Sequence, residues 1–274
     1  MNRMNETFNL GKFTLIITTR CNLRCKLCCE YVPQNVPFPD MTLGECDTLL
    51  STLFSTIDRV NTLHLSGGGE PFLHTYLADL VEACMKYAEK FDRLMLFTNC
   101  TIKPSDILID TLKRYEDKII VQVSLYGIKP KIESEVFTML ESAGVSLKVE
   151  KYYGEDQAFG GWLDFGSWEA YRRTDHELEQ IFKNCAVTRD MQGNWRTRDG
   201  KVHWCSRSQR GMELSYLPES SQDYVDLLDA STREEKREKF RKISEARYLI
   251  ACDYCSGDQG TCNIQKRYPA AEQL

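Results

Sequence analysis

The stretch TTRCNLRCKLCCEYVPQ, residues 18–34, holds four cysteines within nine residues. They are Cys21, Cys25, Cys28 and Cys29. The first three have the spacing CxxxCxxC, and the apolar run before them predicts a buried strand over residues 12–19. Barrel-type α/β folds place their chemistry in loops that follow strands in this way. Three thiolates can hold three irons of a 4Fe–4S cluster and leave the fourth iron open. A structural zinc site completed by the fourth cysteine is the alternative that the spacing leaves open.

The composition of the chain argues against several classes of function. Of its 274 residues, 42% are hydrophobic and 27% are charged, as in ordinary globular proteins. A net charge of −5 does not favour broad binding to nucleic acid or anionic membranes. No apolar run reaches the roughly 18 residues of a membrane span, and the first ten residues lack the apolar core of a secretion signal. Twelve cysteines without such a signal indicate metal or redox chemistry, and we expect a cytoplasmic protein.

Strand and helix patterns alternate through the first 153 residues. Strands are predicted over residues 12–19, 60–66, 93–99, 119–127 and 145–153. Helical patterns separate them, beginning near residues 42, 77, 104 and 130. This alternation indicates βα units around a parallel sheet. Five to six units are too few for a closed eight-unit barrel, so we predict an α/β fold with an open, partial (β/α) barrel.

A second motif, GGGEP at residues 67–71, follows the second predicted strand directly. Glycines are needed where the main chain must approach another group closely. An ordinary glycine turn before a helix gives the same pattern.

A second group of cysteines lies in the last ninety residues. Its members are Cys185, Cys205, Cys252, Cys255 and Cys262. A hairpin is expected around Gly193 and Gly200, between the first two of them. Four thiolates that include a CxxC pair suit either zinc or an iron–sulfur cluster.

The order of these motifs resembles that of the radical S-adenosylmethionine (radical SAM) enzymes over roughly residues 12–153. The resemblance implies that Cys21, Cys25 and Cys28 bind a 4Fe–4S cluster whose open iron chelates S-adenosylmethionine. It also implies that an electron from the cluster cleaves the sulfonium. The 5′-deoxyadenosyl radical that is released then abstracts a hydrogen atom from the substrate.

The resemblance further implies cofactor-binding residues at the ends of the strands. These are Gly67, Gly68, Gly69, Glu70, Asn99 and Ser124. The glycine-rich segment is similar to the family's GGEP motif, whose backbone contacts the methionine amino group. FTN, ending at Asn99, resembles the family's third-strand TNG, with Cys100 in place of the glycine. Ser124 fits a fourth-strand serine that faces the methionyl and ribose end. Leu27 departs from the aromatic residue that many members carry beside the third cysteine.

The second cysteine group resembles the auxiliary-cluster extensions called twitch and SPASM domains. Their signature is a CxnGxxxxC hairpin followed by a distant CxxC, and five cysteines suit the smaller twitch form. The resemblance implies a second 4Fe–4S cluster, acting as an electron acceptor, on Cys185, Cys205, Cys252 and Cys255. Cys262 remains an alternative ligand, an inert thiol or a hydrogen-atom donor. We therefore expect three parts: a radical SAM core over 1–160, a connection over 161–184 and a small cysteine-rich auxiliary domain over 185–274.

Three functions remain open at this stage. The first is oxidation or epimerisation of a small polar metabolite, such as a sugar or aminocyclitol. The second is maturation of a ribosomally made peptide by a thioether or carbon–carbon crosslink or by epimerisation. The sequence before the first strand leaves no room for a leader-binding domain, which favours the metabolite. The third is a non-catalytic zinc-binding interaction protein. For the enzymes we expect an electron donor such as flavodoxin or ferredoxin, and neither nucleic acid nor a membrane as partner.

Other side chains have competing interpretations. Cys29, Cys46, Cys84 and Cys100 are expected to be small and buried. His64 is expected to be packed within its strand. Arg207 and Arg210 either bind an anionic group of the substrate or are solvated charges. The segment 162–168, rich in Trp and Gly, either covers the barrel mouth as a substrate lid or plugs it. The charged helix expected over residues 231–245 is interpreted as a solvated face.

Overall fold

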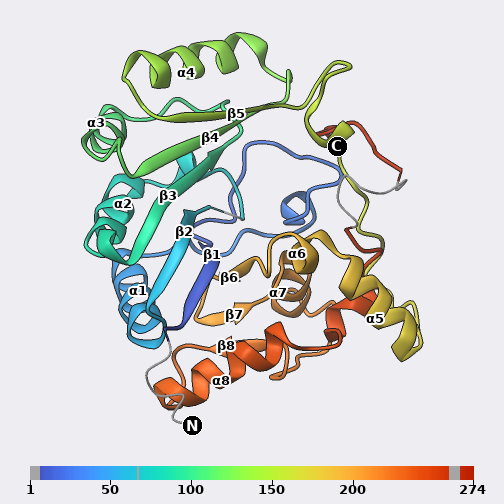
Figure 1. Cartoon of the computed structure of the whole chain (residues 1–274). Helices are drawn as coiled ribbons and strands as arrows, with labels where there is room; N and C mark the ends of the chain where they lie inside the picture. The colour runs from blue at the N-terminus through green and yellow to red at the C-terminus, as the bar shows by residue number, and fades with distance from the viewer. Residues whose placement is uncertain (1–6, 67, 259–265) are drawn as a thin grey trace.

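A single sheet of eight strands organises the chain (Figure 1). The structure is a computed structural model that describes residues 7–66, 68–258 and 266–274. The strands are β1 Asn9–Leu15, β2 Arg59–Leu65, β3 Phe91–Thr98, β4 Ile119–Leu125, β5 Leu147–Lys151, β6 Trp195–Thr197, β7 Lys201–His203 and β8 Tyr224–Asp226. Their order is β5-β4-β3-β2-β1-β6-β7-β8. Strands β1 to β5 are parallel and β6 runs parallel to β1, whereas β7 and β8 are antiparallel. The sheet is not closed, which confirms the prediction of an open, partial barrel.

Helices connect the strands as predicted. They are α1 Leu43–Thr56, α2 Leu77–Met85, α3 Asp106–Arg114, α4 Pro130–Ser142, α5 Asp175–Asn184, α6 Ala186–Arg189, α7 Ser206–Glu213 and α8 Arg233–Ser244. Short 3-10 helices span Val32–Gln34, Pro71–Leu73, Ala88–Lys90, Ala158–Gly160 and Ile250–Tyr254. Helix α1 begins where expected because Thr42 and Glu45 form a capping box. Among the described residues, none of these helices is both apolar and long enough to span a bilayer.

The two faces of the sheet differ in chemistry. The face covered by α1 to α4 is apolar, and its strand residues include Phe13, Leu15, Leu63, Leu65, Leu94, Leu96, Val121 and Val123 (Figure 1). The opposite face carries Lys12, Thr14, His64, Gln122, Lys148, Glu150 and Arg196, interspersed with Met95, Phe97 and Ile120. Parallel sheets are usually apolar on both faces. This face is instead polar, and at β6 it meets α7, where Arg196 Nε donates to Gln209 Oε1 at 2.6 Å. We refer to it below as the polar face.

The strands of the C-terminal part extend this same sheet. Strand β6 pairs with β1, so that Thr14 lies next to Arg196. Helix α8 packs beneath β6 to β8, with the Phe240 ring centroid 4.9 Å from that of Trp195. The interpretation of this charged helix as a solvated face was wrong. Phe240 is fully buried, and the buried Arg237 donates a 2.7 Å hydrogen bond from its Nε to the carbonyl of Thr56.

Candidate functional site

The loop that carries the first cysteines is closed at its base by Asp40. Its Oδ1 accepts hydrogen bonds from the Thr18 hydroxyl at 2.7 Å and from Arg20 Nε at 3.1 Å. Arg20 also forms an ion pair with this carboxylate, which holds the pKa of Asp40 below its usual value despite partial burial. The loop therefore leaves and re-enters the fold at one fixed point.

The glycine-rich segment packs directly on the start of this loop. A Cβ at Gly69 would lie 2.0 Å from the carbonyl oxygen of Arg20, and a Cβ at Gly68 would lie 2.5 Å from that of Thr18. Neither glycine has a positive φ, so the requirement is for space and not for backbone freedom. The two glycines thus allow close packing against the segment that leads into the cysteine loop, while their predicted contact with S-adenosylmethionine stays a prediction.

Glu70 joins the ends of three strands. Its main-chain N donates to the Arg20 carbonyl at 2.8 Å. Its carboxylate accepts hydrogen bonds from the Thr98 hydroxyl at 2.9 Å and from the Asn99 main-chain N at 2.7 Å. Burial raises the pKa of Glu70 to about 7, although these donors favour the carboxylate. Glu70 therefore links the loops after β1, β2 and β3, through its main chain to the first and through its carboxylate to the third.

Asn99 lies close to the first cysteine. Its Nδ2 is 3.8 Å from the Sγ of Cys21 and donates a 3.0 Å hydrogen bond to Asn22 Oδ1. The next residue, Cys100, is buried and has a φ of 58°. Glycine adopts this left-handed conformation without strain, which explains why a glycine fits that position in TNG.

The structure brings Cys21, Cys25 and Cys28 together. Burial, with smaller contributions from the neighbouring thiols, raises the pKa of Cys21 to about 11 and that of Cys25 to about 12. Among the described residues, no three His, Cys, Asp or Glu side chains converge closely enough to hold one metal ion. A 4Fe–4S cluster would bind the three thiolates through three different irons. Cys29 is exposed, so its expected burial was wrong, whereas Cys46, Cys84 and Cys100 are buried as expected.

A C-terminal segment covers the cysteine loop, which the sequence did not reveal. Gln273 forms an antiparallel β-bridge with Cys25. Two main-chain hydrogen bonds flank the bridge, from Lys26 N to the Glu272 carbonyl at 2.7 Å and from Leu274 N to the Arg24 carbonyl at 2.9 Å. The side-chain amide of Gln273 donates to the Cys25 sulfur at 3.4 Å. A predicted cluster ligand therefore already has a fixed hydrogen-bond donor.

Ser124 lies near the end of β4 and is buried. Its hydroxyl interacts with Tyr126, whose pKa is raised mainly by burial and is lowered slightly by this serine. Tyr126 packs against the cluster of Leu23, Cys25 and Ala271. Ser124 is thus linked to the cysteine loop through one tyrosine.

Four cysteines of the second group also lie together. They are Cys185 between α5 and α6, Cys205 at the start of α7, and Cys252 and Cys255 in and after the last 3-10 helix. Burial, with smaller contributions from the thiols of Cys185 and Cys255, raises the pKa of Cys205 to about 12. Main-chain N–H groups of Ser208 and Gly257 approach the sulfurs of Cys205 and Cys255 at 3.5 and 3.3 Å. Of the predicted site residues, Gly67 and Cys262 lie outside the described residues.

Buried arginines connect the two cysteine groups. The Arg207 guanidinium donates to the Tyr31 hydroxyl, three residues after Cys28. Its Nε donates to the Tyr254 carbonyl, next to Cys255, at 2.8 Å.

A second link runs through the residue before Tyr31. Arg196 pairs with Glu30 at 2.7 Å, and Arg210 donates to the Glu30 carbonyl at 3.1 Å. Arg207 and Arg210 are 4% and 1% exposed, so the interpretation of both as solvated charges was wrong.

Segment 162–168 is held by the same arginine. The guanidinium carbon of Arg207 lies 3.5 Å from the ring centroid of Trp168. The arginine also donates to the carbonyls of Gly166 and Ser167. The segment is therefore fastened between the two cysteine groups.

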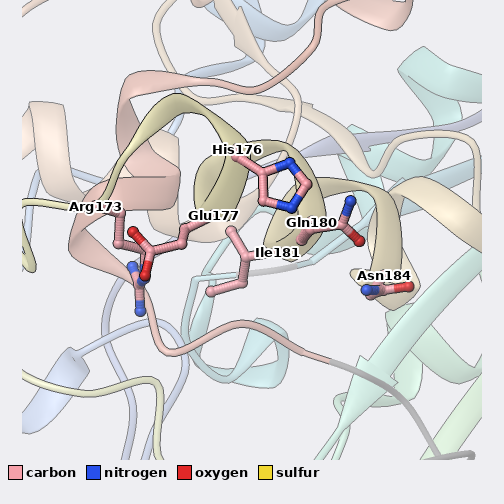
Figure 2. Close-up of a pocket in the computed structure, with 6 residues that line it drawn as sticks. All are labelled: Arg173, His176, Glu177, Gln180, Ile181 and Asn184. Carbon is pink, nitrogen blue, oxygen red and sulfur yellow. The ribbon is translucent and has the colours of Figure 1, made fainter.

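A surface groove on α5 is a different kind of feature (Figure 2). It has a volume of about 280 Å³ and is lined by Arg173, His176, Glu177, Gln180, Ile181 and Asn184. Most of these side chains are exposed, and none is a cysteine. The groove contains no residue predicted to bind a cofactor.

A family model matches the part of the chain that carries the first cysteine loop and the glycine-rich segment. Residues 15–141 match the family model described as the radical SAM superfamily. This part of the chain is a radical SAM domain. It contains the cysteine loop, the glycine-rich segment and the strand ends described above. No curated protein matches the sequence.

Two of the similar solved structures share the fold over most of the chain. Native anSMEcpe with bound AdoMet is 13% identical, with a TM-score of 0.56 over 92% of this chain and 93% of that chain. BtrN in complex with AdoMet and 2-DOIA is 14% identical, with a TM-score of 0.55 over 98% and 100%. Streptococcus suis SuiB bound to S-adenosylmethionine is 16% identical, with a TM-score of 0.44. The chain spans only 36% of the length of SuiB, and 56% of this chain is matched.

Replacing Gly69 by alanine should destabilise the radical SAM domain. The added Cβ would overlap the Arg20 carbonyl, so we expect a loss of about 3 kcal/mol or more in the free energy of unfolding. Gly44→Ala is the matched control, because nothing lies within 4 Å of a Cβ there. It should be neutral or up to about 1 kcal/mol stabilising. Equal stability of the two variants in urea unfolding would contradict the packing argument.

Substitutions at Cys100 should separate backbone strain from side-chain packing. Cys100→Gly and Cys100→Ala both remove the thiol, which donates to the Glu133 carbonyl at 3.4 Å. Only glycine also relieves the left-handed backbone strain. Cys100→Gly should therefore be about 1 kcal/mol more stable than Cys100→Ala in urea unfolding. A more stable alanine variant would show that strain is absent.

Proposed function

We propose that this protein is a radical SAM enzyme with two 4Fe–4S clusters that oxidises or epimerises a small polar metabolite. The observation that carries the proposal is the presence of two separate groups of partly or fully buried thiols, one on the loop after β1 and one assembled from distant parts of the C-terminal region. Cys21, Cys25 and Cys28 would hold the first cluster. Cys185, Cys205, Cys252 and Cys255 would hold the auxiliary cluster, with Cys262 as a candidate ligand or hydrogen donor.

The first cluster, when bound, supplies the electron that cleaves S-adenosylmethionine to the hydrogen-abstracting 5′-deoxyadenosyl radical. The chain's own residues hold the loop that presents the three thiols. Asp40 closes the base of the loop, Glu70 fixes the adjoining strand ends, and the C-terminal segment covers one side. Gly68 and Gly69 let the second loop pack directly against the start of the cysteine loop.

The auxiliary group is suited to electron transfer rather than to substrate binding. Four thiols complete the coordination of a 4Fe–4S cluster, so no iron is left for a substrate. Arg207 joins Tyr31, near the first group, to Tyr254, near the second. It would hold the two groups at a constant separation. A reductant such as flavodoxin or ferredoxin would supply electrons from outside.

A polar metabolite is favoured because the polar face carries charged and amide side chains. A Gln122 Nε2–Glu150 Oε2 hydrogen bond of 2.9 Å and a Lys148 Nζ–Glu150 Oε1 ion pair of 2.9 Å lie on this face. BtrN, whose structure includes 2-DOIA as well as AdoMet, shares this fold. Peptide maturation is the second candidate, because anSMEcpe with bound AdoMet and Kp18Cys peptide also shares it, with a TM-score of 0.52.

Iron content tests the cluster assignment. After anaerobic reconstitution the full chain should contain about eight irons, consistent with two 4Fe–4S clusters. A Cys21/Cys25/Cys28→Ala variant and a Cys185/Cys205→Ala variant should each retain about four. Cys29→Ala is the control, because it removes a neighbouring exposed thiol, and this variant should retain all of the irons. About four irons in the wild type, falling to none in the first variant, would remove the auxiliary cluster from the proposal.

The hydrogen bond from Gln273 should raise the reduction potential of the first cluster. Hydrogen bonds to a cluster thiolate favour the more electron-rich, reduced state. Gln273→Leu should therefore make the reduction potential more negative, by on the order of tens of millivolts. Redox titration followed by electron paramagnetic resonance measures the shift. Glu272→Gln is the control in the same segment, because that side chain pairs only loosely with Lys26, at 3.7 Å. An unchanged potential in Gln273→Leu would show that the amide does not act on the cluster.

The substrate class is tested by 5′-deoxyadenosine formation. With S-adenosylmethionine and a reductant, polar metabolites should stimulate its formation above the uncoupled rate. Peptides of matched concentration should not. Stimulation by peptides alone would favour the second candidate function.

A further inference from the structure

The polar face contains a buried histidine with an unused ring nitrogen. His64 is 5% exposed, and its Nε2 has no hydrogen-bond partner among the described residues. Its Nδ1 lies 3.4 Å from the Thr14 hydroxyl, and its ring meets Phe97 edge-on at 5.0 Å. Buried polar atoms almost always have a partner, so this nitrogen requires an explanation.

Lys12 is a second group without an acceptor. It lies on the same face as Thr14 and His64, because Thr14 is the register partner of His64 and Lys12 precedes Thr14 by two residues. It is partly buried, and it makes no hydrogen bond or ion pair with any residue in the described part of the chain. Burial lowers the pKa of Lys12, and the Lys148 ammonium lowers it further. Lys148 lies on the same face of the sheet, on β5, four strands along from β1.

The acidic groups nearby are already paired. Glu150 binds Lys148 at 2.9 Å, and Glu30 binds Arg196 at 2.7 Å. Lys12 therefore leaves an excess positive charge on the polar face. Burial, with smaller contributions from Lys12, Arg196 and Lys148, lowers the pKa of His64 to about 3, so the ring is neutral. Native proteins seldom bury a charge without a partner.

We propose that Lys12 and His64 bind an anionic oxygen group of the substrate, a carboxylate or a phosphate. In this arrangement the Thr14 hydroxyl donates to Nδ1, so Nε2 carries the ring proton and donates to the anion. Lys12 supplies the compensating charge. This inference rests on the proposed function, because the site lies on the same polar face. It narrows the substrate from a polar metabolite to an anionic one.

The position of the site fits the end of a substrate remote from the cofactor. His64 lies near the end of β2, which leads directly into the glycine-rich segment. An anion held here would lie deeper along the sheet than the cysteine loop. The remainder of the substrate would then extend towards the carboxyl ends of the strands.

Anion binding to the full-length reconstituted protein tests the proposal. The probes are inorganic phosphate and, separately, malonate, in isothermal titration calorimetry. We expect one saturable site for at least one probe, weakened at least tenfold in Lys12→Met and in His64→Leu. Lys86→Met is the matched control, because Lys86 is exposed and pairs with Asp47 at 2.9 Å. Its binding should equal that of the wild type.

Thermal unfolding gives an independent readout. Lys12→Met removes an unpaired, partly buried charge, so the variant should melt no lower than the wild type without anion. The bound probe should raise the melting temperature of the wild type but not that of Lys12→Met. This comparison also shows that the variant is folded.

Two results would overturn the inference. Binding that is unchanged in both variants would mean an adventitious ion only, bound elsewhere. No saturable binding of either probe would mean that ordered water satisfies His64. Iron content in the same samples reports on the proposed function separately. Two clusters without an anion site would contradict only this inference, whereas an anion site without clusters would contradict only the proposed function.

Discussion

The contact between the glycine-rich segment and the Arg20 carbonyl is the constraint on which the rest of the site depends. A side chain at Gly69 would occupy the place of that carbonyl, 2.0 Å away. The Glu70 main chain donates to the same oxygen, and the Glu70 carboxylate then fixes Asn99. Three strand ends are thereby locked together through atoms of the chain itself. The cysteine loop therefore begins from a preorganised position before any cofactor is bound, which is what a site for reactive chemistry requires.

The division of the sheet into an apolar and a polar face follows from its open shape. Helices α1 to α4 cover one face and supply most of the apolar core. The other face is free of such helices and carries charged residues that are satisfied mainly by one another, such as Lys148 with Glu150. Burying polar groups is energetically unfavourable unless each has a hydrogen-bond or ion-pair partner. Where partners are missing, at His64 and Lys12, a ligand is the physical explanation that we favour.

Local patterns were sufficient to predict most of the fold and part of the site. Apolar runs and helical periodicity gave the first five strands and the helices between them, because burial of one face imposes those periods on the sequence. The two cysteine groups were also recognisable from spacing, and Asn99 from the resemblance of its motif to TNG. Arg207 was not, because its partner Tyr31 is 176 residues away and nothing in CSRSQRG distinguishes a buried arginine from a solvated one. The same applies to Gln273, which reaches Cys25 across 248 residues.

These long-range contacts join the C-terminal part of the chain to the part that carries the first cysteines. Strand β6 continues the sheet beside β1, and Arg196 and Arg210 both hold Glu30 at the end of the first cysteine loop. Gln273 donates to Cys25. A substitution in the second cysteine group would therefore affect the position of the first group through packed, charged side chains. This effect would add to any electron transfer between the two proposed clusters. Because a buried arginine that loses its partner is costly, these links favour a single relative position of the two groups.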